Sequence, residues 1–342
     1  MGPREFFRLP GSGRHPTRVQ AAERTRVNRS GFLTFALASL VAATPLALAQ
    51  NENQGQGEAV VTVLPKKTDA PPSDVSQQAV QISVNGKSTS IASWQPLRGE
   101  QAGVELVLLI DDDARSSLGR EMQDITHFVQ SLPPNVKFTI AYMENGRAAL
   151  TGPLTADHAQ ALKGLRLTMG PAGESASPYF CLSDLARHWP SSDRSVRREV
   201  IMITDGVDLY HLRYDPEDPY VLAAIQDAAH AHLLVYSIYW HDVGLAGRSG
   251  YENSTGQNYL LEVTQATGGN SYWIGFGNPV SLQPYFEDFS RRLQNQYELG
   301  FAVPLRGKGN LESLRVKVKA PDASVTAPHE VWVTAAGAPG PQ

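Results

Sequence analysis

Residues 104–110 read VELVLLI and run directly into three aspartates, Asp111, Asp112 and Asp113. A mainly apolar run of this length is typical of a strand buried on both faces of a parallel sheet. A second run, residues 200–203, ends in the same way at Thr204-Asp205-Gly206. In open α/β sheets, ligands bind beyond the carboxyl ends of the strands. The two runs therefore predict one shared acidic site at that edge of a sheet.

Strand-like and helix-like segments alternate through the middle of the chain. Apolar residues recur at spacings of three and four over residues 118–132, which predicts an amphipathic helix. Ser177-Pro178 is a helix start, because serine caps and proline fits the first turn. The strand predicted over 136–143 is followed by the hairpin turn Asn145-Gly146, so residues 148–151 should pair antiparallel at an edge. The alternation predicts an α/β fold, a doubly wound and mostly parallel sheet with helices on both faces.

The first 49 residues have the pattern of a secretory signal peptide. Seven arginines lie between positions 4 and 29, an apolar stretch follows over 32–48, and the stretch closes on Ala47-Leu48-Ala49. This order predicts export, with cleavage before Gln50. The alternative is a membrane anchor that is not cleaved. Pro45 and the small residues around the Ala47-Leu48-Ala49 site disfavour it. We expect a periplasmic, cell-surface or secreted protein without a further membrane span.

The rest of the chain divides by composition. Residues 50–76 are rich in Gln, Asn, Gly, Pro and Ser, which predicts a disordered linker. Residues 77–102 contain alternating apolar residues around Asn85-Gly86 and predict a β-hairpin segment. The α/β domain is expected over 103–296. Three strand-like runs in 297–342 predict a C-terminal β extension, so a short β appendage should stand at each end.

Charge and cysteine content exclude several classes of protein. The leader carries seven arginines against two glutamates, so its removal changes the net charge from −4 to −9. Nucleic-acid binding needs a basic face, so we expect no nucleic-acid partner. Cys181 is the single cysteine, which excludes an intramolecular disulfide and a cysteine-based zinc site. It lies between Phe180 and Leu182 and should be buried in the core.

Several motifs together resemble one known family. They are the Asp111-x-Asp113-x-Arg115 turn, the Ser177-Pro178 helix start, Thr204-Asp205-Gly206, Ala266-Thr267-Gly268-Gly269 and the segment 295–301, NQYELGF. In this order they resemble the von Willebrand factor A (vWA) domain, and more closely the secreted bacterial branch called the VWFA-related domain of Acidobacteria. The resemblance covers roughly residues 77–335. It implies a six-stranded, mostly parallel sheet and a role in protein binding.

The resemblance also implies a divalent-cation site, called MIDAS, that a carboxylate of the partner protein completes. Carried over to this sequence, Asp111 and Asp205 match the two aspartates of the motif, and Ser177 stands at the threonine position, with Ser175 as the alternative. Asp113 and Arg115 replace the two motif serines. Asp113 can serve as an oxygen ligand for Mg²⁺, whereas a guanidinium cannot bind a cation. Metal binding through Asp111, Asp113, Ser177 and Asp205, and acidic loops that bind no ion, both remain open.

Aromatic side chains near the predicted carboxyl edge suggest a protein interface. The interface candidates are Arg115, Tyr210, Tyr214, Trp240 and Tyr251. His241-Asp242 follows a strand and is an acid–base candidate, although no nucleophile elbow, His-Glu-x-x-His or phosphate-binding loop accompanies it. We therefore expect a binding module without enzymatic activity. The alternatives are an assembly scaffold that acts through its β-rich tail and, less favoured, an α/β hydrolase-like enzyme.

Overall fold

The computed structural model describes residues 54–99, 102–114, 116–171, 175–241, 249–304 and 309–335. All of them belong to one compact unit, Gln50–Gln342. Within these ranges the strands form two sheets, one of six strands and one of eight. No helix in the described residues is long and apolar enough to cross a membrane.

The six-stranded sheet confirms the predicted α/β fold. Its strand order is β10-β9-β8-β5-β6-β7, and only β7 runs antiparallel to its neighbour, as the Asn145-Gly146 turn predicted. The strands are β5 (Val104–Asp111), β6 (Val136–Glu144), β7 (Arg147–Leu150), β8 (Arg197–Thr204), β9 (Leu233–Tyr239) and β10 (Ser271–Tyr272). Every residue of β5 is buried, which explains its almost unbroken apolar sequence.

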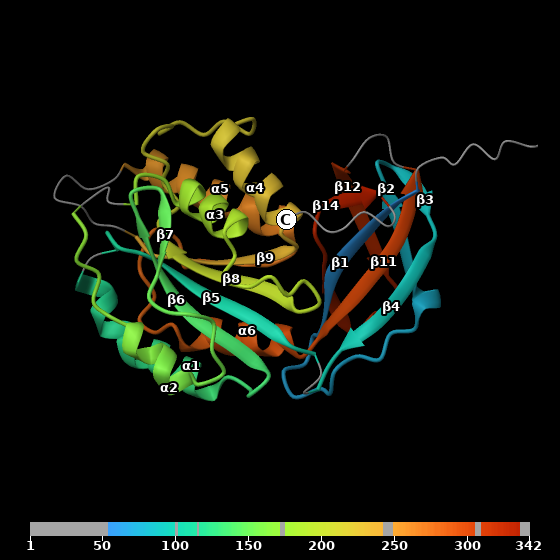
Figure 1. Ribbon diagram of the computed structural model, residues 1–342, viewed down its shortest axis with the longest axis horizontal. Helices are drawn as coiled ribbons and strands as arrows, with labels where there is room; N and C mark the ends of the chain where they lie inside the picture. The colour runs from blue at the N-terminus through green and yellow to red at the C-terminus, as the bar shows by residue number, and fades with distance from the viewer. Residues whose placement is uncertain are drawn as a thin grey trace, which may run out of the picture. The chain divides into compact units, whose positions relative to one another are not determined.

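Helices cover both faces of this sheet (Figure 1). One face packs against α1 (Met122–Ser131) and α6 (Gln283–Leu293), the other against α3 (Pro178–Arg187), α4 (Pro219–His230) and α5 (Gly250–Thr267). Short helical turns complete this part of the chain: η2 (Ser116–Glu121), α2 (His158–Ala161) and η3 (Leu162–Gly164). Successive residues of β5 and β8 enter the two cores alternately, as the period of a strand requires.

Local signals set the helix ends. Pro178 begins α3 after the extended Ser177, as predicted, but the Ser177 side chain makes no capping hydrogen bond. Helix α5 begins directly after Ser249, which forms a capping box with Glu252. Gly268 ends the same helix in the left-handed conformation that glycine tolerates. Cys181 lies in the α3 core as expected, and burial raises the pKa of its thiol.

The second sheet is antiparallel and draws on both ends of the described chain. Its order is β3-β2-β12-β14-β1-β11-β4, and β13 pairs with the far end of β1. The strands are β1 (Gln54–Pro65), β2 (Val80–Val84), β3 (Lys87–Thr89), β4 (Ile91–Leu97), β11 (Gln296–Pro304), β12 (Gly309–Val318), β13 (Ala323–Thr326) and β14 (Glu330–Ala335). A turn, η1 (Gln77–Ala79), precedes β2.

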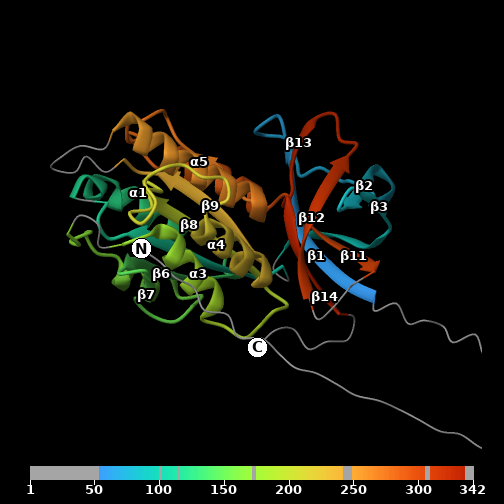
Figure 2. The same cartoon turned by 90° about the horizontal axis from the view of Figure 1, so that it is seen from above.

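The prediction of a disordered linker over residues 50–76 was wrong where the structure describes it. Residues 54–65 form β1, which pairs with β11 along nine residues and with β14 and β13 on its other side. Figures 1 and 2 show the blue β1 among red and orange strands. Val61 and Val63 are completely buried in this sheet. The stretch is polar in composition because its first half alternates exposed and buried residues, and short residues such as Gly57 fill the buried positions.

The two predicted β appendages are therefore one sheet, and the α/β segment is inserted between its halves. Two chain segments connect the sheets, one before β5 and one after α6, and Arg197 at the start of β8 contacts both. Its guanidinium donates hydrogen bonds to Ala102 O (3.1 Å) before β5 and to Leu293 O (3.2 Å) at the end of α6. It also bonds to Gln296 Oε1 at the start of β11.

Candidate functional site

The predicted acidic site forms where β5 and β8 end side by side. The parallel register pairs Ile110 with Ile203, so Asp111 and Thr204 follow as neighbours. Thr204 Oγ1 donates a 2.6 Å hydrogen bond to Asp111 Oδ2, and Gly206 N donates to Thr204 Oγ1 at 3.1 Å. The threonine of Thr-Asp-Gly thus joins the two strand ends through its hydroxyl.

Three carboxylates meet at this edge of the sheet. Asp111, Asp113 and Asp205 are only 2%, 3% and 4% exposed. Burial raises the pKa of Asp111 well above its usual value, and the negative charges of Asp113 and Asp205 raise it further. The Thr204 hydrogen bond opposes this shift without cancelling it. The structure therefore brings together the three aspartates that the sequence analysis selected.

The backbone of Thr-Asp-Gly is held against helix α5 by two glycines. Gly206 has a φ of 70°, and a Cβ there would lie 2.6 Å from Gly256 O. A Cβ on Gly256 would lie 2.2 Å from Asp205 O. Asp205 Oδ1 accepts a 2.9 Å hydrogen bond from Val207 N, which closes the loop on itself. Both glycines are required for this close approach.

Ser177, the predicted fourth member of the site, is completely buried at the start of α3. In the described part of the chain, neither Ser177 Oγ nor Asp208 Oδ2 has a protein partner in hydrogen-bond geometry. Burial raises the pKa of Asp208, and the backbone N–H of Tyr210 together with the nearby Ser177 hydroxyl lowers it. Asp208 adds a further buried carboxylate beyond Thr-Asp-Gly. The sequence analysis missed it because no motif marked the third residue after Asp205.

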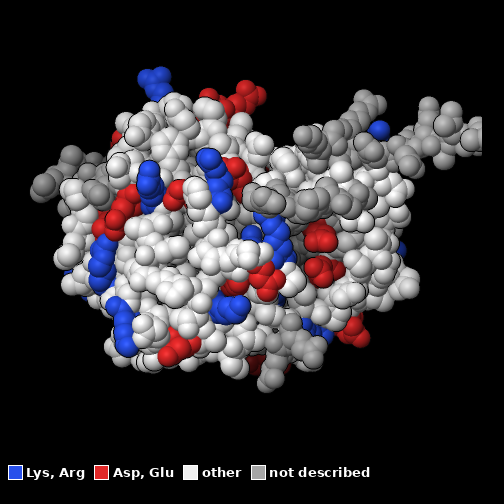
Figure 3. Space-filling model, viewed as in Figure 1, with Lys and Arg blue, Asp and Glu red and all other residues white. Residues whose placement is uncertain are grey.

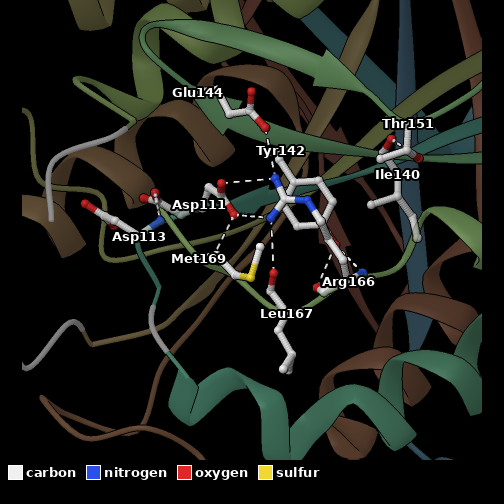
Figure 4. A network of polar contacts seen from close by, with 10 residues as sticks. Asp111, Asp113, Ile140, Tyr142, Glu144, Thr151, Arg166, Leu167 and Met169 are labelled. Atoms are coloured by element: carbon white, nitrogen blue, oxygen red, sulfur yellow. Dashed lines mark hydrogen bonds and ion pairs between the residues drawn. The ribbon is translucent and has the colours of Figure 1, made fainter. Parts of the chain in front are cut away.

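Asp112, the middle aspartate of the triplet, is neutralised by an arginine from another segment. Arg166 Nη1 and Nη2 lie 2.5 Å and 3.0 Å from the two Asp112 oxygens, and Nη2 lies 2.9 Å from Glu144 Oε1. The Arg166 guanidinium also stacks on the Tyr142 ring, 3.8 Å from its centre (Figure 4). The bonds to Asp112 raise the pKa of Arg166. Nothing in the sequence around Arg166 marked this role, because its partner lies 54 residues earlier.

The interface candidates divide into exposed and buried residues. Tyr210, Tyr214 and Tyr251 are 59%, 39% and 56% exposed. The prediction that Trp240 lies at an interface was wrong, because its side chain is only 2% exposed and packs in the sheet core. Trp240 N donates to Thr204 O at 2.9 Å, which continues β9 beside β8. Arg115 lies outside the described residues.

The acid–base candidate His241 is held in a structural arrangement. Its Nδ1 lies 3.3 Å from the Tyr239 hydroxyl, and its backbone exchanges hydrogen bonds with the Asn278 side chain. Asp242, its predicted partner, lies outside the described residues. The contacts with Tyr239 and Asn278 fix the end of β9.

The donor set at the acidic edge suits a hard cation. Mg²⁺ prefers oxygen ligands and takes one or two carboxylates together with water molecules. Ser177 Oγ is a buried oxygen that makes no hydrogen bond of ordinary geometry among the described residues, although it lies near Asp208. A cation would relieve the repulsion between Asp111 and the neighbouring carboxylates. Within those residues, no three Asp, Glu, His or Cys side chains by themselves form a metal site. A cation here would therefore need the serine hydroxyl or water as well.

Comparison with known proteins gives structural matches only. No family model and no curated protein matches the sequence. Similar solved structures include an aerotolerance-related membrane protein from Bacteroides fragilis, at 15% identity and a TM-score of 0.41, covering 56% of this chain and 98% of that one. The SpRpn10 VWA domain matches at 10% identity and a TM-score of 0.33, covering 54% and 93%.

A third similar solved structure covers a larger share of the chain. The pilus adhesin SpaC from Lactobacillus rhamnosus GG, in its open conformation, matches at 9% identity and a TM-score of 0.41. The match covers 80% of this chain and 47% of the adhesin. At these identities the likeness concerns the fold alone.

Proposed function

We propose that this chain is an exported vWA-type binding module that recognises a protein through the loops at the carboxyl edge of its six-stranded sheet. The observation that carries the proposal is the hydrogen bond from Thr204 to Asp111, which joins two strand ends into one acidic rim. Loops at this edge of an α/β sheet are the usual place for a binding site.

Exposed aromatic residues border this acidic rim and supply the apolar part of the proposed surface. Tyr210 N donates a 2.8 Å hydrogen bond to Asp208 Oδ1, so the exposed tyrosine is positioned beside this buried carboxylate. Its ring packs against Phe180 and Tyr220 at 5.1 Å and 6.2 Å between centres. A tyrosine held in this way loses little conformational freedom on binding, which is a property of interface anchors.

Charge distribution supports a protein partner. On the face of Figure 3, acidic and basic side chains are interspersed and separated by wide uncharged areas. A nucleic-acid partner would require a continuous basic face. The alternative of an assembly scaffold would need free strand edges in the C-terminal tail. The tail strands instead pair with strands of the same chain: β11, β12, β13 and β14 pair with one another or with β1, β2 and β4.

A divalent cation is part of the proposal as a co-ligand of the partner. Asp111, Asp113, Ser177 and Asp205 would hold it, and it would supply positive charge to bind a carboxylate of the partner protein. Two observations support this assignment: the Ser177 hydroxyl is completely buried at the start of α3, and the pKa of Asp111 is raised.

Affinity capture with the unit Gln50–Gln342 tests the proposal. The immobilised wild type is incubated with the extracytoplasmic proteins of the source organism, and bound proteins are quantified by mass spectrometry. Tyr210→Ser and Asp205→Ala should each weaken retention of the same partner, by roughly 30-fold or more if Tyr210 is an anchor. Leu222→Ser on α4, 41% exposed and outside the site, is the matched control. Identical captured proteins for all four baits would contradict the proposal.

A further inference from the structure

A cavity of about 140 Å³ lies between the two sheets, at the edge of the six-stranded sheet opposite the acidic rim. We call it the junction cavity. Charged and titratable groups that line it come from both sheets. The lining on the α/β side includes Arg194, Arg197 and His232, and the lining on the antiparallel side includes Glu58, Glu298 and Glu330. A basic wall and an acidic wall thus border one space.

The basic wall forms where β8 and β9 begin. Arg198 pairs with Leu233 in the parallel register, so Arg197 and His232 precede them as neighbours. Among the described residues, the Arg197 guanidinium donates its hydrogen bonds to carbonyl and amide oxygens. Its Nε is buried and has no partner in this part of the chain. The positive charge of Arg197 is therefore not cancelled by a hydrogen-bonded carboxylate.

His232 stands in the basic wall in an unusual backbone conformation. It follows α4 with a φ of 55°, the left-handed conformation in which helices usually have glycine. Burial, together with the charge of Arg194, lowers the pKa of its imidazole to about 4, so the ring is neutral at pH 7. No described residue forms a hydrogen bond with this ring. A mostly buried imidazole that is both strained and unsatisfied is typical of a ligand-binding position.

The acidic wall comes from neighbouring strands of the antiparallel sheet. Glu58 in β1 pairs with Gly300 in β11, so Glu298 is its diagonal neighbour on the same side of the sheet. Glu330 begins β14, which also pairs with β1. Burial raises the pKa of Glu298 and of Glu330, and the charge of Glu58 raises that of Glu298 further. A positive group placed beside these carboxylates would relieve the repulsion.

A ligand that suits both walls carries one charge of each sign. Its ammonium group lies beside the glutamates, and its carboxylate lies beside the arginine and the histidine. A molecule with a single charge meets one wall of its own sign, which weakens its binding. The cavity limits the size of the ligand, because a cavity of about 150 Å³ in another protein holds benzene. Alanine has the same number of non-hydrogen atoms as benzene.

From these walls we infer that the junction cavity is a binding site for a small amino acid in its zwitterionic form. Glu298 and Glu330 hold the ammonium group. The neutral His232 ring donates a hydrogen bond to the carboxylate, and the charge of Arg197 stabilises it. Because each end of the ligand binds a different sheet, the ligand also joins the two sheets. The inference does not depend on the acidic rim or on its partner.

Isothermal titration calorimetry of the unit Gln50–Gln342 with glycine, L-alanine and β-alanine tests this inference. EDTA in the buffer keeps any cation at the acidic rim from binding the probes. At least one of the three should bind with a Kd of about 1 mM or tighter. Propionate lacks the ammonium group and ethylamine lacks the carboxylate, so each should bind roughly tenfold more weakly or less. The inference is overturned if no zwitterion binds, or if either singly charged compound binds as tightly as the best of them.

Two variants locate the binding site. Glu298→Gln keeps the shape of the side chain, and it should weaken zwitterion binding roughly tenfold and reduce the preference over propionate. His232→Asn removes the imidazole but keeps a residue that tolerates the left-handed conformation, and it should also weaken binding. Glu217→Gln, at an exposed position outside the cavity, is the matched control for a lost charge and should bind like the wild type.

Circular dichroism checks that the variants are folded. Unchanged zwitterion binding by both Glu298→Gln and His232→Asn would place the ligand outside the junction cavity and overturn the inference.

Discussion

Thr204 Oγ1 donates a 2.6 Å hydrogen bond to Asp111 Oδ2 and thereby connects the ends of two neighbouring parallel strands. The bond places Asp111 where the charges of Asp113 and Asp205 act on it. It also uses one Asp111 oxygen for a structural contact. The acidic edge is thus assembled at the cost of repulsion among buried carboxylates, which is common at functional sites.

Asp111→Asn should stabilise the protein when divalent ions are removed with EDTA. The pKa of Asp111 is higher in the folded state than in the unfolded state, so the ionised side chain disfavours folding. The stability that the protonated side chain contributes is fully present below the unfolded pKa and is lost as pH rises through the folded pKa. At pH 7 the neutral amide avoids this loss, so the variant should unfold at a higher temperature than the wild type. Thermal unfolding at pH 7 and pH 4 measures it, and the gain should shrink at the lower pH.

Asp112→Asn is the matched control and should have the opposite effect. Asp112 pairs with Arg166, so the amide leaves a guanidinium without its main partner. Because the Arg166 side chain is 36% exposed, the loss should be modest, about 0.5–1 kcal/mol. Equal effects of the two amides would contradict the different environments of these neighbouring aspartates.

Mg²⁺, Mn²⁺ or Ca²⁺ should raise the unfolding midpoint of the wild type above its value in EDTA, because a ligand of the native state stabilises it by mass action. At an ion concentration of about 100 times the Kd, the gain is about 2.7 kcal/mol. Ser177→Ala should lose the ion-dependent gain in midpoint, measured for each protein relative to its own value in EDTA, because the variant also lacks the contact between the Ser177 hydroxyl and Asp208. Midpoints that do not respond to any of the three ions would count against a cation.

Gly256→Ala should destabilise the protein although alanine normally favours a helix. The new Cβ would lie 2.2 Å from Asp205 O, so either α5 or the Thr-Asp-Gly loop must shift. We expect a loss of about 1–3 kcal/mol, typical of overpacking. Gly250→Ala in the same helix has no neighbour within 4 Å of its Cβ and should be neutral or stabilising. Urea unfolding of both variants measures the difference.

Val61→Ala should destabilise the antiparallel sheet by about 2 kcal/mol, because Val61 is completely buried in β1. Gln56→Ala, at an exposed position of the same strand, should change the free energy of unfolding by less than about 0.5 kcal/mol. Chemical denaturation provides the measurement. If residues 54–65 were an unstructured linker, the two substitutions would be equally harmless.

Much of the α/β part could be predicted because its signals are local. Strand β5 and residues 200–203 of β8 have nearly continuous apolar sequences. Pro178 after Ser177 specifies a helix start, and Asn145-Gly146 specifies a hairpin. The meeting of Asp111 and Asp205 followed from the rule that parallel strands end at one edge. These features depend on residues close together in the chain.

The sequence by itself determined the alternation of elements and the acidic ends of two core strands. Only the tertiary structure decided that β1 is an inner strand, because its partners β11, β13 and β14 lie more than 200 residues further along the chain. The same holds for the burial of Trp240 and for the pairing of Asp112 with Arg166. The spacing of apolar residues in a sequence shows which side of a single helix or strand is buried. Pairing between distant segments depends on which surfaces meet when the whole chain packs.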